Sequence, residues 1–168
     1  MQGMREFSHA FFFFRIVFFP LSCYVMLNIF QGGLPMADFF EQVREYINQN
    51  DTFCKANNMT LEVVKLGYAE AVLKVTEHSY NAVHTVQGGA IFTLADLAFA
   101  GAANSYGDKC IAMTATASFV RPGTGNTLRA VAREVSKGRR SCLIDVEVRN
   151  EENKLVAKIQ ITGFFFEK

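Results

Sequence analysis

One aspartate, Asp96, lies in the middle of residues 88–105, an apolar stretch rich in alanine that reads as a single helix. A helix that is apolar on every side is a buried helix. None of the positions three or four residues from Asp96 holds a Lys or Arg. A buried carboxylate without a cation is costly, and burial raises its pKa toward the range of a general base. We therefore predict that Asp96 is catalytic; the alternative is a core aspartate bonded to a distant hydroxyl or backbone group.

Two glycines, Gly88 and Gly89, follow Gln87 where this helix begins. Glycines let a substrate approach the backbone, and the first N–H groups of a helix are unpaired and electropositive. This arrangement suits the negative charge that develops on a carbonyl oxygen during acyl transfer. Gly88 and Asp96 are separated by roughly 12 Å along one helix, so one site cannot easily use both from the same chain. The spacing predicts a dimer with its sites between subunits.

The rest of the pattern predicts the elements that position these residues. Residues 37–48 have the apolar spacing of a short amphipathic helix. Only the stretch around Asp96 is apolar enough to form a core helix, so we predict an α+β fold in which a curved antiparallel sheet wraps around one long central helix. The expected strands, bounded by turn residues, are 60–65, 68–76, 111–120, 128–136, 141–149 and 154–166.

Composition limits the classes of function and of site that the chain can have. The 168 residues suit one domain, and a formal net charge of +1 argues against a general nucleic-acid binder. Cysteines that lie far apart, without a CxxC motif or clustered histidines, argue against a zinc site and a dense disulfide framework. We expect reduced thiols in a cytoplasmic protein without metal or cofactor. The cysteines are Cys23, Cys54, Cys110 and Cys142.

Residues 1–35 form a phenylalanine-rich segment of different composition. A signal peptide or membrane anchor would use Arg5 as its positive flank, but no small-residue cleavage site follows. Alternatively, the segment is a mis-assigned start, because residues 31–33 can be encoded by a purine-rich ribosome-binding sequence shortly before Met36. We favour the mis-assigned start, which leaves residues 36–168 as the domain and no membrane partner.

Residues 81–100, NAVHTVQGGAIFTLADLAFA, continued by residues 104–105, closely resemble the signature of PaaI-type hotdog thioesterases. Residues 119–123 and 137–140 also resemble that family, and the likeness covers about residues 55–168. It implies the hotdog fold and a homodimer that pairs into a tetramer. It also implies metal-free hydrolysis of aromatic or medium-chain acyl-CoA to free acid and CoA.

The resemblance assigns roles to single residues. Asp96 matches the catalytic acid, acting as general base on water or as nucleophile, and the Gly88 N–H matches the group that polarises the thioester carbonyl. Asn81 matches an asparagine that lines the site from the other subunit. Gln87 stands where the family commonly has His, and His84 where it commonly has Gly. Glutamine can donate a hydrogen bond to a carbonyl, but it cannot shuttle protons.

Further residues are expected to bind substrate. Gly89 adds to the close approach at the helix start, and Thr114 or Thr116 would position water or substrate. Basic residues on turns and strand ends are usually just solvated, but here they would also suit the phosphates of CoA. These basic residues are Arg121, Lys137, Arg139 and Arg140.

Two other functions stay open for such a fold. An enoyl-CoA hydratase or dehydratase would typically use a histidine with an acid, and position 87 lacks it. A non-catalytic acyl-CoA-binding protein is the other alternative, because Gln87 cannot transfer protons.

Overall fold

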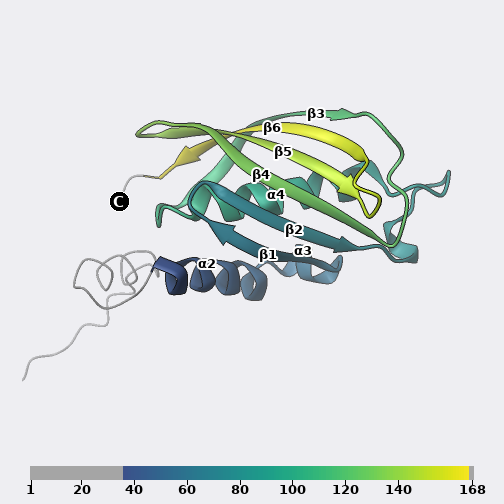
Figure 1. Ribbon diagram of the computed structural model, residues 1–168, viewed down its shortest axis with the longest axis horizontal. Coiled ribbons are helices and arrows are strands. Elements are labelled where there is room, and N and C mark those ends of the chain that lie inside the picture. The colour runs from purple at the N-terminus through teal and green to yellow at the C-terminus, as the bar shows by residue number, and fades with distance from the viewer. Residues whose placement is uncertain (1–35, 167–168) are drawn as a thin grey trace, which may run out of the picture.

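The computed structural model describes residues 36–166, in which two short helices precede a sheet wrapped around one long helix (Figure 1). The expected order of helix, two strands, long helix and four strands is confirmed. The elements are α2 (Met36–Asn50), α3 (Thr52–Ala56), β1 (Met59–Lys65), β2 (Tyr68–Lys74), η1 (Glu77–Ser79), α4 (Gly88–Asn104), β3 (Cys110–Phe119), β4 (Thr127–Lys137), β5 (Ser141–Asn150) and β6 (Leu155–Phe165).

All strand pairs are antiparallel, in the order β1-β2-β4-β5-β6-β3. The first two predicted strands, β1 and β2, form an antiparallel hairpin, and Gly67 takes a φ of +64° in its turn. On β5 the buried side chains alternate with half-exposed ones. The predicted curved sheet around a central helix is therefore confirmed (Figure 1).

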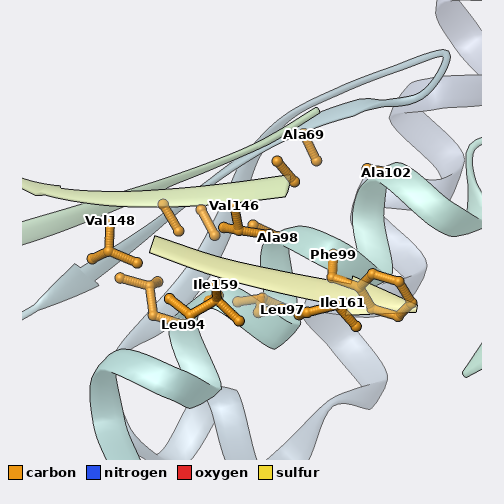
Figure 2. Packing of buried hydrophobic residues seen from close by; sticks show 14 of the residues in the cluster. Ala69, Leu94, Leu97, Ala98, Phe99, Ala102, Val146, Val148, Ile159 and Ile161 are labelled. Atoms are coloured by element: carbon orange, nitrogen blue, oxygen red, sulfur yellow. The ribbon is translucent and has the colours of Figure 1, made fainter. Parts of the chain in front are cut away.

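The core lies between α4 and the concave face of the sheet. Leu94 and Phe99 of α4 pack in one buried cluster with Val146 of β5 and Ile159 of β6 (Figure 2). Each such side chain contributes roughly 1.5–3 kcal/mol when fully buried. Gly101 allows the helix to approach most closely, because a Cβ there would lie 2.8 Å from the Ala69 side chain.

Helix α3 was not predicted from the sequence. Asp51 is its N-cap and accepts a hydrogen bond from the Cys54 amide at 2.9 Å, while Asn57 is its C-cap. Polar residues that cap a helix are the same ones that favour turns. A helix of five residues between such caps therefore resembles a loop in the sequence.

Helix α4 was expected to be buried on every side, and this was wrong. Its partly exposed residues recur three or four positions apart, as one face of a helix requires. The sheet curves around only one side of α4, which leaves this strip without cover from the strands. The strip, called the open face of α4 below, consists of Gly89, Phe92, Thr93, Asp96, Ala100 and Asn104.

The two edges of the sheet differ. Strand β1 is covered by α2, and the Asn48 side chain bonds both the amide and the carbonyl of Leu61, at 2.8 and 2.9 Å. Within residues 36–166 strand β3 pairs only with β6, and Ile111 and Met113 are 55% and 60% exposed. An apolar edge strand is a template for pairing with another chain.

No helix among residues 36–166 is long and apolar enough to cross a membrane. The hypotheses on residues 1–35 lie outside the described residues.

Candidate active site

Asp96 lies at the centre of the open face of α4, half-buried. Within residues 36–166 its carboxylate has neither a hydrogen bond nor an ion pair, so the alternative of a satisfied core aspartate finds no support there. Burial raises the pKa of Asp96, and the carboxylate of Asp51, the N-cap of the neighbouring α3, raises it further. An unpartnered carboxylate with a raised pKa on an accessible helix face is suited to accept a proton from water.

The start of α4 is built by Gln87, whose side-chain oxygen caps the helix by accepting a hydrogen bond from the Ala90 amide at 3.1 Å. This bond occupies the oxygen and leaves the NH₂ group as the part of Gln87 that can donate to a substrate. Gly88 is the first residue of α4, and a Cβ placed there would lie 3.7 Å from the Phe119 ring. Its amide is one of the donors that the helix itself leaves unpaired, and it has no hydrogen-bond partner in the part of the chain that the structure describes.

Asn81 shapes the loop that leads into α4. Its side-chain oxygen accepts hydrogen bonds from the amides of Val83 and Thr85, at 3.0 and 3.1 Å, and its NH₂ group donates to the Thr85 hydroxyl at 2.9 Å. The loop is tied down where the Gln87 amide donates to the Ser79 carbonyl at 2.8 Å. Asn81 therefore holds this loop within its own chain; its contact with a second subunit stays a prediction.

His84 lies in the same loop, exposed, with a φ of +57°. Thr114 and Thr116 lie on the exposed edge strand β3, opposite Thr162 and Gln160 of β6. Among the described residues, no hydrogen bond links either threonine to Asp96 or to Gly88.

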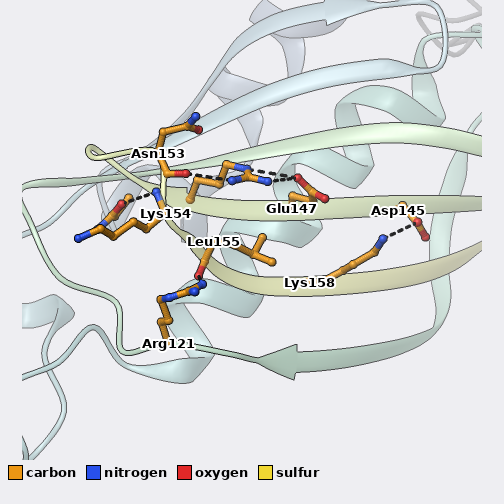
Figure 3. Close-up of polar contacts among 9 residues, drawn as sticks. Arg121, Asp145, Glu147, Asn153, Lys154, Leu155 and Lys158 are labelled. Atoms are coloured by element: carbon orange, nitrogen blue, oxygen red, sulfur yellow. Dashed lines mark hydrogen bonds and ion pairs between the residues drawn. The ribbon is translucent and has the colours of Figure 1, made fainter.

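The four basic residues fall into two groups at opposite ends of β3. Arg121 follows that strand, and its guanidinium donates to the Leu155 carbonyl at 2.8 Å (Figure 3). At the other end, the Lys137 ammonium lies 4.6 Å from the centre of the Tyr106 ring. Arg139 and Arg140 belong to the same β4–β5 turn. Ten strand residues span about 33 Å, so one phosphate cannot contact both groups within one chain.

Two neighbours of the site were missed. Asp51 lies 45 positions before Asp96, and Phe119 lies 31 positions after Gly88. No local spacing links such distant residues, because the packing of α3 on α4 and the return of β3 bring them close. Among the described residues no group of three or more His, Cys, Asp or Glu could hold a metal ion.

Residues 84–157 match the model of the thioesterase superfamily. The acyl-coenzyme A thioesterase PaaI of Escherichia coli is 36% identical over 110 residues, which cover 65% of this chain and 79% of the relative. A solved structure of E. coli PaaI, from the phenylacetic acid degradation operon, is similar with a TM-score of 0.76 and 30% identity, over 79% of this chain and 97% of that one.

Two more solved structures are similar. A mutant of the phenylacetic acid degradation protein PaaI from Thermus thermophilus has a TM-score of 0.64 and 33% identity, over 68% of this chain and 98% of that one. The smu.793 protein of Streptococcus mutans, bound to acetyl CoA, has a TM-score of 0.63 and 28% identity, over 66% of this chain and 90% of that one. The chain thus belongs to the thioesterase superfamily, among its PaaI-type hotdog thioesterases.

Proposed function

We propose that this thioesterase hydrolyses acyl-CoA, with an aromatic or medium-chain acyl group, at a site shared by two subunits. The half-buried Asp96 carboxylate, unpartnered within the described residues, is the observation that carries the proposal. The relatives support the substrate class, because E. coli PaaI is named an acyl-coenzyme A thioesterase and the S. mutans protein was solved with acetyl CoA. They favour hydrolysis over the hydratase and the non-catalytic binder.

In the proposed reaction, Asp96 accepts a proton from water while the water oxygen attacks the thioester carbonyl. The carbonyl oxygen becomes negative and accepts a hydrogen bond from the Gly88 amide at the start of the partner's α4. The C–S bond then breaks, and the CoA thiolate takes up the proton that Asp96 accepted. Direct attack by the Asp96 carboxylate, followed by hydrolysis of the anhydride, gives the same acid and thiol. Neither route uses a metal or cofactor.

We infer that the second subunit docks along β3. This strand is an apolar, uncovered edge among the described residues, with Ile111 and Met113 facing outward. Antiparallel pairing of β3 with its copy would set the start of one strand beside the end of the other. Arg121 of one subunit would then lie near Lys137 and Arg139 of the next, so the two basic groups would meet.

The proposal extends to the remaining expectations. Thr114 and Thr116 lie on that same strand and would contact water or substrate at the junction. Gln87, through its free NH₂ group, and Gly89, through its lack of a side chain, would complete the helix start. A tetramer formed from two such dimers, in the cytoplasm, is part of the proposal.

Replacement of Asp96 tests the mechanism. Asp96→Asn keeps the size of the side chain but cannot accept a proton, so we expect acyl-CoA hydrolysis to fall by about 10²–10⁴-fold. Asp38→Asn, a matched change of an exposed carboxylate on α2, should leave hydrolysis unchanged. Thiol release is followed with a chromogenic reagent, and circular dichroism verifies that both variants fold. Full activity in folded Asp96→Asn would refute the assignment of Asp96.

A further inference from the structure

Two buried cysteines lie side by side at the end of the sheet remote from Gly88 and Phe119. Cys110 begins β3 and Cys142 is near the start of β5, and their sulfurs are 3.8 Å apart. Strand β6 runs between them, and Gly163 makes the room: a Cβ there would lie 2.6 Å from the Cys110 sulfur and 2.8 Å from that of Cys142. The two sulfurs therefore meet across a glycine.

The backbone keeps this pair from forming a relaxed disulfide. Neighbouring strands lie about 4.8 Å apart, so two strands separated by a third hold their Cα atoms about 9.6 Å apart. A disulfide needs Cα atoms within about 7 Å and sulfurs about 2.05 Å apart. Closing the bond would require β3 and β5 to move toward each other across β6. A single bridging atom between the sulfurs requires no such movement.

We propose that Cys110 and Cys142 form a two-thiolate site for a soft monovalent cation, copper(I). Thiolates are the protein ligands that soft copper(I) prefers. With a metal–thiolate bond of about 2.3 Å, copper(I) bound linearly by two sulfurs would set them about 4.6 Å apart. Small rotations of the two side chains would widen the 3.8 Å separation of the sulfurs to that distance. Zinc(II) would need two more ligands, and the described residues offer no third His, Cys, Asp or Glu there.

Charge around the pair fits this ion. Binding exchanges two thiol protons for one Cu⁺ and leaves a net charge of −1 on the two sulfurs and the metal. Lys137 is the cross-strand partner of Cys142, and its ammonium lies 4.7 Å from the centre of the Phe165 ring, beside Cys110. The nearby Glu134 carboxylate accepts a hydrogen bond from the Tyr106 hydroxyl. The lysine thus offsets the charge of the complex.

Both cysteines lie at strand ends beside turns, where local opening costs least and admits an ion.

The test uses the full chain with Cys23→Ser and Cys54→Ala, so that only the pair remains. Under anaerobic reducing conditions, copper(I) is titrated against a chromogenic copper(I) chelator. We expect one copper(I) per chain, release of protons, and a rise in Tm of a few degrees. Adding Cys110→Ser or Cys142→Ser should weaken binding by at least about 100-fold, because one of two ligands is lost.

Either of two outcomes would overturn the site: complete retention of copper by the chelator, or equal binding after removal of either cysteine. If the serine variants do not fold, X-ray absorption at the copper edge of the parent protein decides. Two sulfur neighbours would support the site, whereas nitrogen or oxygen neighbours would refute it. Acyl-CoA hydrolysis is measured in parallel, since the copper site does not depend on the role of Asp96.

Discussion

Replacing Gly88 by alanine should separate catalysis from stability. Gly88 does not have a positive φ, and the added Cβ would meet only the Phe119 ring, at an ordinary 3.7 Å. Alanine in place of a conformationally compatible glycine stabilises a protein by about 0.4–1 kcal/mol, mainly by restricting the unfolded chain. At about 2–4 °C per kcal/mol for a chain of this size, the Tm of Gly88→Ala should rise by about 1–4 °C.

Hydrolysis should change in the opposite direction. The added methyl group occupies the space through which a thioester carbonyl would approach the Gly88 amide. If that approach is blocked, the loss corresponds to removing one oxyanion donor, about 10²–10³-fold in kcat. The comparison variant is Gly89→Ala, whose Cβ would lie 2.6 Å from the Gln87 side-chain oxygen and so displace the helix cap. Loss of a cap costs about 0.5–2 kcal/mol, so the Tm of this variant should fall.

Calorimetry gives both Tm values, and the chromogenic thiol assay with an aromatic acyl-CoA gives kcat and KM. Parental kcat and KM in a Gly88→Ala protein of raised Tm would show that the carbonyl does not approach this amide. Loss of activity with a lowered Tm would contradict the packing around Gly88.

Three further outcomes are expected. Ser105→Ala should destabilise the fold by about 1–3 kcal/mol in urea unfolding, because the buried Ser105 hydroxyl accepts from the Gly67 amide at 2.9 Å and alanine leaves that donor unpaired. In pH–rate profiles, kcat/KM should fall as pH decreases through the pKa of Asp96, which lies above the ordinary value of about 3.9. Asp51→Asn should move this acidic limb of the profile to lower pH, because the Asp51 carboxylate raises the pKa of Asp96. An unmoved limb would contradict the coupling of the two carboxylates. The pKa of Asp96 is higher in the folded state than in the unfolded state. The stability that this gives is present below the unfolded-state pKa and is lost as pH rises through the folded-state pKa. Asp96→Asn should therefore be at least as stable as the parent at pH 7, which urea unfolding measures.

Much of the fold followed from local pattern. Alternation of apolar and polar residues along 141–149 is enough to indicate a strand with one buried face, and the turn at Leu66-Gly67 marks a hairpin. The long apolar helix around Asp96 could be recognised because its apolar residues recur on every side. The open face of this helix could not be recognised in the same way, because an apolar composition suits burial by the sheet and burial by a second subunit equally.

The sequence by itself determined the residues of the proposed site: one carboxylate without a nearby cation, and a glycine-rich helix start too far along the same helix to act with it. Tertiary structure alone decided what surrounds them. It placed Asp51 near Asp96, Phe119 against Gly88, and the sulfur of Cys110 next to that of Cys142 across Gly163. The physical reason is that the helical repeat and local hydrogen bonds relate residues only a few positions apart, so that spacing in the sequence can indicate them. Strand order and the packing of a helix on a sheet join positions tens of residues apart, and no local spacing encodes such contacts.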